Sequence, residues 1–493
     1  MDKTKSFIKI DPRDNVAVAI EAVPAGASAL GVTLLDDIPT GHKLALADIA
    51  LGENVVKYGF PIGHATEAVA QGKHIHVHNL KTNLSGLLEY TYDPADIPVL
   101  PAKSGTFMGY KRADGGVGIR NEIWIVNTVG CVNRPAERIA AEANRRFAGR
   151  TDGVFTFVHP YGCSQLGDDH THTQEVLAGL VKHPNAAGVL VLGLGCENNT
   201  IKSFREVLGA VDDRRVKFLT AQEADDEVEA ALALIEELVA YAETCKREPV
   251  DIGKLVIGLK CGGSDGFSGI TGNPLVGRMS DRVIQHGGIS LLSEVPEMFG
   301  AETILMNRCG TEALFDQTVS LINDFKEYYM RYNQVVYENP SPGNKDGGIS
   351  TLEDKSLGCT QKGGTQAVTA VLRYGDRAET PGLNLLQGPG NDIVACTALT
   401  AAGAHVILFT TGRGTPVGGP VPTIKIATNA DLARRKANWT DFNAGMALEG
   451  TSMDDAADAL WAKVLAVAEG REQTRNEENN YREIAIFKDG VTL

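Results

Sequence analysis

The chain has 493 residues, of which 43% are hydrophobic and 22% charged; this composition is ordinary for a globular enzyme, and the length is too great for a single hydrophobic core. Its formal net charge of -15 argues against nucleic acid and anionic membranes as partners. No apolar run suits a signal peptide or a membrane span, and the eight cysteines form no CxxC pair, so we expect a cytoplasmic protein with reduced thiols.

Residues 1–95 are typical of a small β domain, with short apolar strands separated by polar turns. Residues 73–79 have the sequence KHIHVHN. As a strand, this segment would place His74, His76 and His78 on one face. Three imidazoles on one face would suit a divalent metal or a sugar-acid carboxylate. The alternative is a polar face exposed to solvent.

Residues 96–106 are rich in proline and small residues and are predicted to be a linker. Residues 107–248 then favour an α/β domain, in which three apolar strands each end in Gly-Cys, at Cys131, Cys163 and Cys196. Such cysteines would meet at the carboxyl edge of one parallel sheet, close to helix N-termini. The alternative is a tight turn that uses a small, buried residue. Residues 246–249 are predicted to be a second linker.

The loop after the strand at residues 154–158 is unusually polar. It offers two imidazoles, a thiol, an amide and two carboxylates within a dozen residues, namely His159, Cys163, Gln165, Asp168, Asp169 and His170. This set could bind a metal or transfer protons. In the alternative interpretation the loop is solvated, and its aspartates cap the helix that follows.

Residues 249–493 are predicted to be a third, α/β domain. Its strand KLVIGLK ends in a glycine-rich turn that contains Cys261, Ser264 and Asp265, and its strand HVILFTT runs into a glycine loop with Arg413 and Thr415. Free amides and a guanidinium there would hold a carboxylate. Neither a Walker loop nor a dinucleotide fingerprint is present.

The longest motifs of the chain resemble those of the altronate and galactarate dehydratase family. They are HIHVHN, RNEIWIVNTVGCVN, HPYGCSQLGDDH, GLGCENN, CGGSDGFSGITGNP, EVPEMFG, YENPSPGNK, TLEDKSLGCTQK and TTGRGTP. The resemblance runs from about residue 8 to the C-terminus. It implies an α/β multidomain protein, with a small N-terminal SAF-like β domain followed by two α/β domains with mainly parallel sheets.

The resemblance also implies a hydro-lyase that removes water from a sugar acid, with iron(II) or manganese(II) as cofactor. Altronate is the first candidate substrate, and galactarate is the alternative. Such an elimination needs a base for the C2 proton, an acid for the leaving hydroxyl and stabilisation of the enediolate. We expect a small-molecule substrate and a homodimer.

The candidate residues fall into three groups. The candidate acids and bases are His76, His159, His170 and Lys362, among which the sequence does not divide the roles. The candidate substrate-binding residues are Asn79, Gln165, Ser264, Asp265, Arg413 and Thr415. The candidate metal ligands are His76, His78, Cys163, Cys196 and Glu197. These sets predict that the first two domains, from one chain or from neighbouring subunits, jointly close the active site.

Two alternatives come from other classes of protein. In the first, Cys131, Cys163 and Cys196 hold an iron–sulfur cluster with one open iron, as in an iron–sulfur dehydratase. In the second, the protein binds a sugar acid without turnover, and the small β domain is the binding module. The concentration of polar groups at several strand ends argues against this second alternative.

Overall fold

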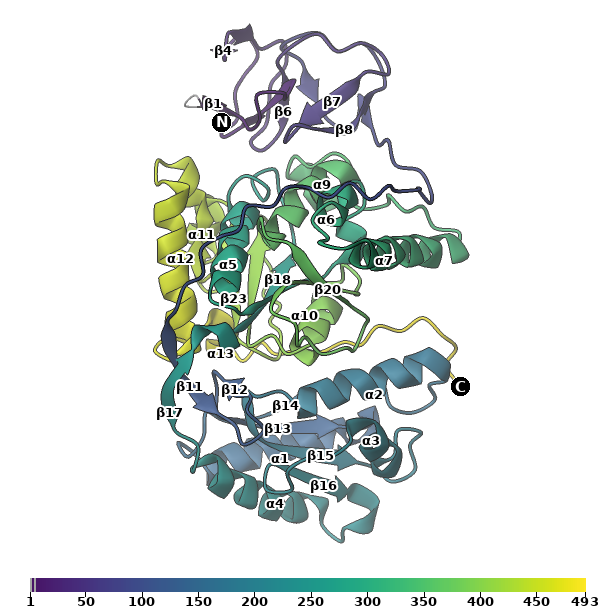
Figure 1. The fold of residues 1–493 in the computed structure, drawn as a ribbon, viewed down its shortest axis with the longest axis vertical. Coiled ribbons are helices and arrows are strands. Elements are labelled where there is room, and N and C mark those ends of the chain that lie inside the picture. Colours follow the sequence, from purple (N-terminus) through teal and green to yellow (C-terminus); the bar gives the residue numbers. More distant parts are fainter. Residues whose placement is uncertain (1, 4–5) are drawn as a thin grey trace.

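The computed structural model describes residues 2–3 and 6–493 and shows three domains in a row (Figure 1). The small β domain lies at one end, the second domain lies at the other end, and the C-terminal domain lies between them. The four-stranded sheet of the second domain and the seven-stranded sheet of the C-terminal domain are parallel throughout. The predicted fold class is therefore confirmed. No helix in the described part of the chain is long and apolar enough to cross a lipid bilayer.

The N-terminal domain is built from short antiparallel strands, which tight turns can join directly. They are β1 (Asp2–Lys3), β2 (Phe7–Lys9), β3 (Val16–Ala19), β4 (Ser28–Ala29), β5 (Val32–Thr33), β6 (Lys43–Ala45), β7 (Asn54–Lys57), β8 (Phe60–Ala65), β9 (His74–Ile75) and β10 (Leu80–Lys81). One sheet has the order β1-β2-β3-β6-β9, and a second has the order β10-β8-β7.

The predicted histidine strand is wrong in its extent. Strand β9 ends at Ile75, and the chain turns over residues 76–79. The buried side chain of Asn79 closes this turn, because it accepts a hydrogen bond from the His76 amide (3.0 Å) and donates one to the His74 carbonyl (2.9 Å). The histidines therefore gather around a turn and do not alternate along a strand.

Residues 82–105 form an extended segment without helix or strand, which crosses the surface of the C-terminal domain (Figure 1). This segment is attached to that surface. Tyr90 donates a hydrogen bond to Glu302 (2.5 Å), and Tyr92 donates one to the Cys309 carbonyl (3.1 Å). The Ala95 amide donates a third to the Asn307 carbonyl (2.7 Å). The predicted linker, residues 96–106, covers only the last part of this segment.

The second domain contains a four-stranded parallel sheet of order β14-β13-β15-β16. Its elements are β11 (Thr106–Lys111), β12 (Val117–Gly118), β13 (Glu122–Asn127), η1 (Gly130–Val132), α1 (Asn133–Arg146), β14 (Val154–Thr156), α2 (Gly167–Val181), β15 (Ala186–Gly193), α3 (Ile201–Leu208), β16 (Val216–Thr220), η2 (Ala221–Glu223), α4 (Glu227–Ala242) and β17 (Arg247–Asp251). Helices cover both faces, so the central strands β13 and β15 are buried along their whole length.

The predicted second linker, residues 246–249, is wrong, because most of it belongs to strand β17. This strand pairs with β11 over five residues, and the two form a small antiparallel sheet with β12. The chain therefore enters and leaves the second domain on adjacent, hydrogen-bonded strands.

The C-terminal domain is built on a seven-stranded parallel sheet of order β20-β21-β19-β18-β22-β23-β24. Its elements are η3 (Ile252–Lys254), β18 (Val256–Cys261), α5 (Gly272–Gln285), β19 (Ile289–Leu292), η4 (Val295–Glu297), α6 (Glu302–Met306), α7 (Glu312–Arg331), α8 (Pro342–Asp346), α9 (Leu352–Cys359), η5 (Thr360–Gly363), β20 (Val368–Leu372), β21 (Gly382–Leu386), α10 (Asp392–Ala401), β22 (Val406–Thr411), β23 (Thr423–Ala427), α11 (Ala430–Arg435), β24 (Phe442–Asn443), η6 (Ala444–Leu448), α12 (Met453–Ala468) and α13 (Arg475–Glu478).

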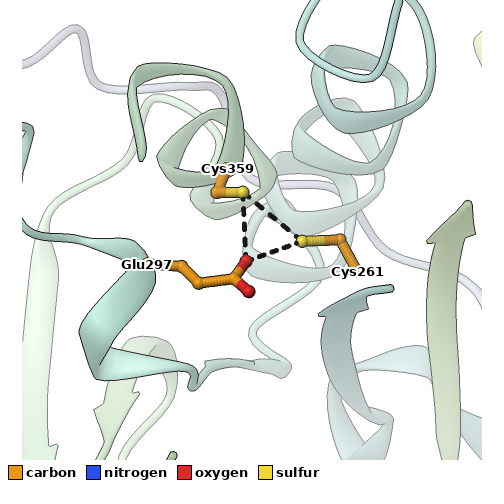
Figure 2. Close-up of side chains that lie close together, drawn as sticks. All are labelled: Cys261, Glu297 and Cys359. Carbon is orange, nitrogen blue, oxygen red and sulfur yellow. Dashed lines mark hydrogen bonds between the residues drawn. The ribbon is translucent and has the colours of Figure 1, made fainter. Parts of the chain in front are cut away.

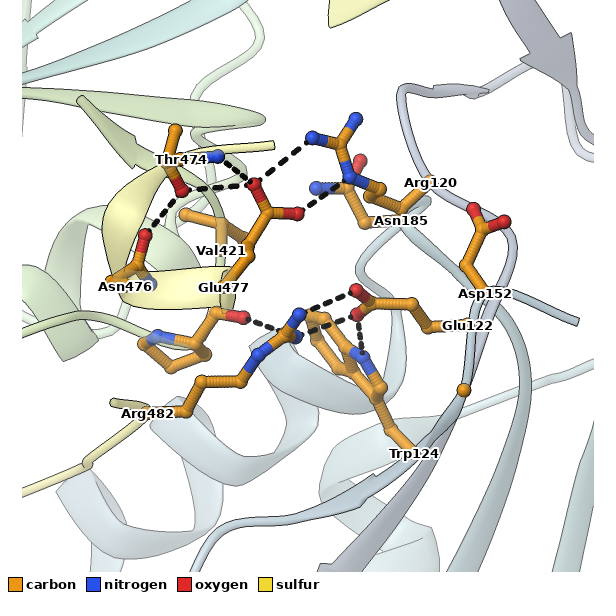
Figure 3. A network of polar contacts seen from close by, with 12 residues as sticks. Arg120, Glu122, Trp124, Asp152, Asn185, Val421, Thr474, Asn476, Glu477 and Arg482 are labelled. Carbon is orange, nitrogen blue, oxygen red and sulfur yellow. Dashed lines mark hydrogen bonds and ion pairs between the residues drawn. The ribbon is translucent and has the colours of Figure 1, made fainter. Parts of the chain in front are cut away.

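Two buried ion pairs join the second domain to the C-terminal end of the chain (Figure 3). Arg120 binds Glu477 at 2.7 Å, and Arg482 binds Glu122 at 2.9 Å. The indole of Trp124 donates a further hydrogen bond to Glu122 (2.7 Å). A buried charge needs its partner, so each pair fixes the positions of its two side chains. The two pairs therefore hold the second domain against the C-terminal segment.

Candidate functional site

Three metal-ligand side chains meet in the C-terminal domain, at the carboxyl edge of its sheet (Figure 2). Cys261 ends β18, Glu297 ends the turn η4 after the neighbouring strand β19, and Cys359 ends helix α9. The Cys261 and Cys359 sulfurs are 3.4 Å apart, and they lie 3.1 and 3.2 Å from Glu297 Oε2. All three side chains are buried.

Three lysines and a second glutamate surround this group. Lys355 binds Glu297 at 2.8 Å, Lys362 binds Glu294 at 2.8 Å, and Lys260 also binds Glu294. Burial alone would raise the pKa of Glu297, but the three lysines hold it well below its usual range. The Cys261 contact and burial raise the pKa of the Cys359 thiol. The lysines therefore keep the Glu297 carboxylate ionised, whereas the Cys359 thiol holds its proton more tightly than usual.

The residues present fit a divalent metal. In the described part of the chain, Cys261, Glu297 and Cys359 are the one group of three or more His, Cys, Asp or Glu side chains whose ligand atoms all lie within 4.8 Å of one another. Two sulfurs and one carboxylate oxygen leave coordination positions open for a substrate. Thiolates favour iron(II) over manganese(II) in such a site.

A cleft of about 810 Å³ opens between the N-terminal and C-terminal domains. Thr40 lines it from the first domain, whereas Asp265 and Arg413 line it from the loops that follow strands β18 and β22 of the third domain. Asp265 also lines a small cavity that reaches Lys355 and Cys359. The cleft and the Cys261–Glu297–Cys359 group therefore lie on two sides of Asp265.

Arg413 and Asp265 differ in their electrostatic surroundings. Arg413 is exposed, and no carboxylate of the described residues lies within ion-pair distance of its guanidinium. Asp265 is buried and accepts hydrogen bonds from Thr428 (2.9 Å) and Asn429 (3.0 Å). Burial raises the pKa of Asp265, and the hydrogen bonds from these donors offset part of that rise. Arg413 is thus available for an anionic ligand.

The imidazoles of the N-terminal domain gather beside this cleft. His42 Nδ1 and His74 Nε2 are 3.0 Å apart, and His42 Nε2 is 3.3 Å from the carbonyl of Asp346, a residue that lines the cleft. The ring of His76 is 4.7 Å from that of His42. Burial lowers the pKa of His74 to about 4 and that of His76 to about 3. These rings are therefore neutral near pH 7.

A buried carboxylate holds the N-terminal domain over the C-terminal domain. Asp354 Oδ2 binds Lys43 and Asp354 Oδ1 binds Lys57, each at 2.9 Å. Both lysines come from the first domain, and Asp354 comes from α9, the helix that ends in Cys359. The docking of the two domains is thus tied to the helix that carries a candidate metal ligand.

Of the predicted residues in the C-terminal domain, most lie near this site. Lys362 belongs to the charged shell, and Asp265 and Arg413 line the cleft. Ser264 is buried beside the small cavity, and its hydroxyl has no partner among the described residues. Thr415 does not line the cleft, and its hydroxyl accepts a hydrogen bond from Val417 in its own loop (3.3 Å).

The structure does not bring the predicted metal ligands of one chain together. His76 and His78 lie in the N-terminal domain, whereas Cys163, Cys196 and Glu197 lie in the second domain, beyond the C-terminal domain (Figure 1). The physical reason is that the histidines lie in a turn of the antiparallel N-terminal domain, the other three residues follow strands of the parallel sheet of the second domain, and the C-terminal domain separates the two. A shared site between the first two domains is therefore not formed within one chain.

The second-domain residues that were predicted to act with them have local partners. Both ring nitrogens of His159 are engaged, one 2.8 Å from the Asn127 carbonyl and the other accepting from the Tyr161 amide (3.2 Å). Gln165 accepts a hydrogen bond from Gly162 (2.9 Å), whereas His170 Nε2 is buried without a partner among the described residues. His159 thus orders its own loop.

Sequence reasoning missed Glu297 and both buried cysteines as ligands, and it also missed His42. The available signal was the position of Cys261 and Glu297 just after two predicted strands, since ligand residues follow strand carboxyl ends. His42 follows Gly41 in a short polar segment, and no pattern there indicated its contact with residue 346.

Comparison with known proteins identifies each domain in turn. Residues 5–83 match a family described as altronate/galactarate dehydratase SAF domain, and residues 109–243 match D-galactarate dehydratase/altronate hydrolase, second domain. Residues 252–492 match D-galactarate/altronate dehydratase, C-terminal.

Full-length relatives agree with these matches. The chain is 54% identical to the altronate dehydratase of Escherichia coli (strain K12) and 52% identical to that of Bacillus subtilis (strain 168), over 99% of this chain and 100% of each relative. It is 32% identical to the galactarate dehydratase (L-threo-forming) of Escherichia coli (strain K12), over 98% of this chain and 97% of the relative.

Proposed function

The chain belongs to the altronate and galactarate dehydratase family and is a sugar-acid hydro-lyase, and we propose that it converts D-altronate to 2-dehydro-3-deoxy-D-gluconate. The two relatives that are more than half identical to the chain are both altronate dehydratases, whereas the galactarate dehydratase is 32% identical. Altronate carries one carboxylate. Two arginines of the described residues line the cleft, and Arg413 is the one without an ion pair, since Arg435 binds Asp431.

The observation that carries this proposal is that a cleft lined by the exposed Arg413 lies beside a buried group of metal ligands. Arg413 lines the cleft, which supports the proposal that its guanidinium holds the substrate carboxylate with two parallel hydrogen bonds. Asp265, on the wall between the cleft and the inner cavity, is placed to accept a hydrogen bond from a substrate hydroxyl. The N-terminal domain contributes Ile20 and Thr40 to one wall of this cleft.

We further propose iron(II), or manganese(II), as the cofactor, held by Cys261, Glu297 and Cys359. When bound, such an ion polarises substrate oxygens and makes the C2 proton more acidic. Lys355 and Lys362 hold the two glutamates of the site in place. Assignment of the general base and the general acid stays a prediction between His76 and Lys362 within one chain. His170 lies in the second domain, away from the cleft, and both ring nitrogens of His159 are already bonded.

The substrate is tested with a panel of sugar acids that contains altronate, galactarate and their epimers. Protein prepared with iron(II) and thiol under anaerobic conditions should form the 2-keto-3-deoxy product from altronate with the highest kcat/KM. A higher kcat/KM for galactarate would reassign the substrate within the family. Binding of altronate without product would instead support a sugar-acid binding protein.

The location and assembly of the protein are also proposals. The described cysteines are all free, which supports a reducing compartment such as the cytoplasm. The homodimer expected from the sequence stays a prediction, and light scattering of the purified protein would test it.

A further inference from the structure

Three exposed cysteines of the second domain lie outside the site described above. Cys131 follows β13, Cys163 follows β14 and Cys196 follows β15. Strand β13 lies between β14 and β15 in the parallel sheet, so the three cysteines come from three adjacent strands. Because these strands are parallel, all three residues are at the same edge.

Direct contacts lock the three loops of this edge together. The Gly130 amide donates to the Tyr161 carbonyl (2.9 Å), which joins the first loop to the second. The Asn199 amide donates to the Gly162 carbonyl (2.9 Å), which joins the second loop to the third. Each bonded residue lies within three positions of a cysteine. Neither Gly130 nor Gly162 has space for a Cβ atom, since the main chain of a neighbouring loop would lie 2.6 and 1.9 Å away.

The spacing of these thiols excludes one metal ion as their ligand in this arrangement. A single tetrahedral ion with sulfur at about 2.3 Å holds its sulfurs about 3.8 Å apart. The three thiols are not all within 4.8 Å of one another, because the described residues contain one such group and it is that of Cys261. An iron–sulfur cubane separates its cysteine ligands more widely, since each thiolate binds a different iron.

The electrostatics of the edge favour a negatively charged cluster. Helices α1, α2 and α3 begin at residues 133, 167 and 201, a few positions after the three cysteines. The N-termini of these helices carry partial positive charge, and they lie at the same carboxyl edge of the sheet as the three cysteines. Glu197, the neighbour of Cys196, carries a negative charge, but its buried carboxylate is held by hydrogen bonds from Thr128 (2.8 Å) and the Leu194 amide (3.0 Å).

We propose that Cys131, Cys163 and Cys196 bind a [4Fe–4S] cluster at this edge, separate from the metal site of the C-terminal domain. Three cysteines leave the fourth iron without a protein ligand, and the exposure of the thiols places that iron at the protein surface, open to water or a small carboxylate. In Figure 1 the C-terminus marks this edge, since the Leu493 amide donates to the Ser164 carbonyl (3.0 Å). The cleft lies in the other half of the molecule.

The test is anaerobic reconstitution of the full chain with iron(III), sulfide and excess thiol, which reduces half of the iron as the cluster forms. Wild-type protein should gain a broad visible absorption band and about four labile sulfides per chain. Cys131→Ser, Cys163→Ser and Cys196→Ser should each lose most of both signals. The reconstituted wild type should also protect these three thiols from alkylation by iodoacetamide, as mass spectrometry of the peptides would show.

Two matched variants separate this cluster from other effects. Cys245→Ser removes a partly exposed thiol of the same domain and should retain the full sulfide content. Cys261→Ser disrupts the metal site in the C-terminal domain and should lose dehydratase activity while retaining the sulfide and the visible band. Iron without labile sulfide in the wild type would overturn the cluster. Equal sulfide content in all five cysteine variants would contradict the proposed location of the cluster, whether or not altronate is still turned over.

Discussion

Glu297 is the residue through which the metal site can be tested most directly. It accepts hydrogen bonds from both thiols and from Lys355. Glu297→Gln keeps the shape but removes the charge, so the protein should lose its bound iron and at least about a hundredfold in turnover. Iron content by mass spectrometry and kcat measure the two effects. Chelation of the wild type should abolish activity, and iron(II) should restore it; full activity of iron-free protein would contradict the proposed cofactor.

Arg413 tests the binding of the substrate carboxylate. Arg413→Lys keeps the positive charge but loses the planar pair of donors, so kcat/KM for altronate should fall by an amount that corresponds to about 1–3 kcal/mol. Arg434→Lys is a matched control, because Arg434 is exposed and binds only Asp431 of its own helix. Equal kinetics of the two variants would assign Arg413 to the structure of its loop.

At the scale of elements, the pair Glu122–Arg482 decides how strand β13 meets the C-terminal segment. Both side chains are almost fully buried. Glu122→Gln leaves the Arg482 charge buried without a partner, which should cost about 3–5 kcal/mol in the free energy of unfolding. Urea titration measures the change. Glu142→Gln, which breaks the exposed pairs with Arg145 and Arg146 on helix α1, should cost far less. Similar losses would show that burial of the first pair has no energetic consequence.

Helix α9 connects the docking of the N-terminal domain to the metal site. Asp354→Asn on this helix leaves Lys43 and Lys57 buried without their carboxylate. The N-terminal domain should then separate more easily, and the variant should lose activity even though Cys359 is unchanged. Limited proteolysis at residues 82–105, followed by mass spectrometry, would detect the separation. Wild-type resistance to the protease together with low activity would instead point to a local change in the position of Cys359.

At the scale of the whole molecule, the N-terminal domain should be necessary for turnover but not for the fold of the rest. Its removal takes away one wall of the cleft. The cut belongs before residue 84, because Tyr90 and Tyr92 pack on the C-terminal domain. A chain of residues 84–493 should remain folded by circular dichroism and show negligible dehydratase activity. Partial recovery on addition of residues 1–83 would support the shared cleft, and normal turnover without them would contradict it.

The local patterns of the sequence were sufficient to predict the three domains' classes and many of their elements. The apolar run ending at Cys261 and the amphipathic pattern near residues 454–469 correspond to β18 and α12. Such patterns are reliable because a buried parallel strand and a surface helix each impose their own hydrophobic period. Tertiary contacts decided the exceptions. The hydrogen bonds of Asn79 close a turn in the histidine segment, which therefore is not a continuous strand. Most of the predicted second linker is a strand because it pairs with β11.

By itself the sequence determined that polar and sulfur-containing residues follow the strands of two parallel sheets, because strand, turn and helix signals are local. Only the tertiary structure decided which of these residues meet. Cys261 and Cys359 are 98 positions apart, and they come together because β18 and β19 are neighbours and α9 packs above their ends. The same three-dimensional order placed the C-terminal domain between the histidines of the first domain and the cysteines of the second, since nothing in a linear spacing encodes the distance between two sheet edges.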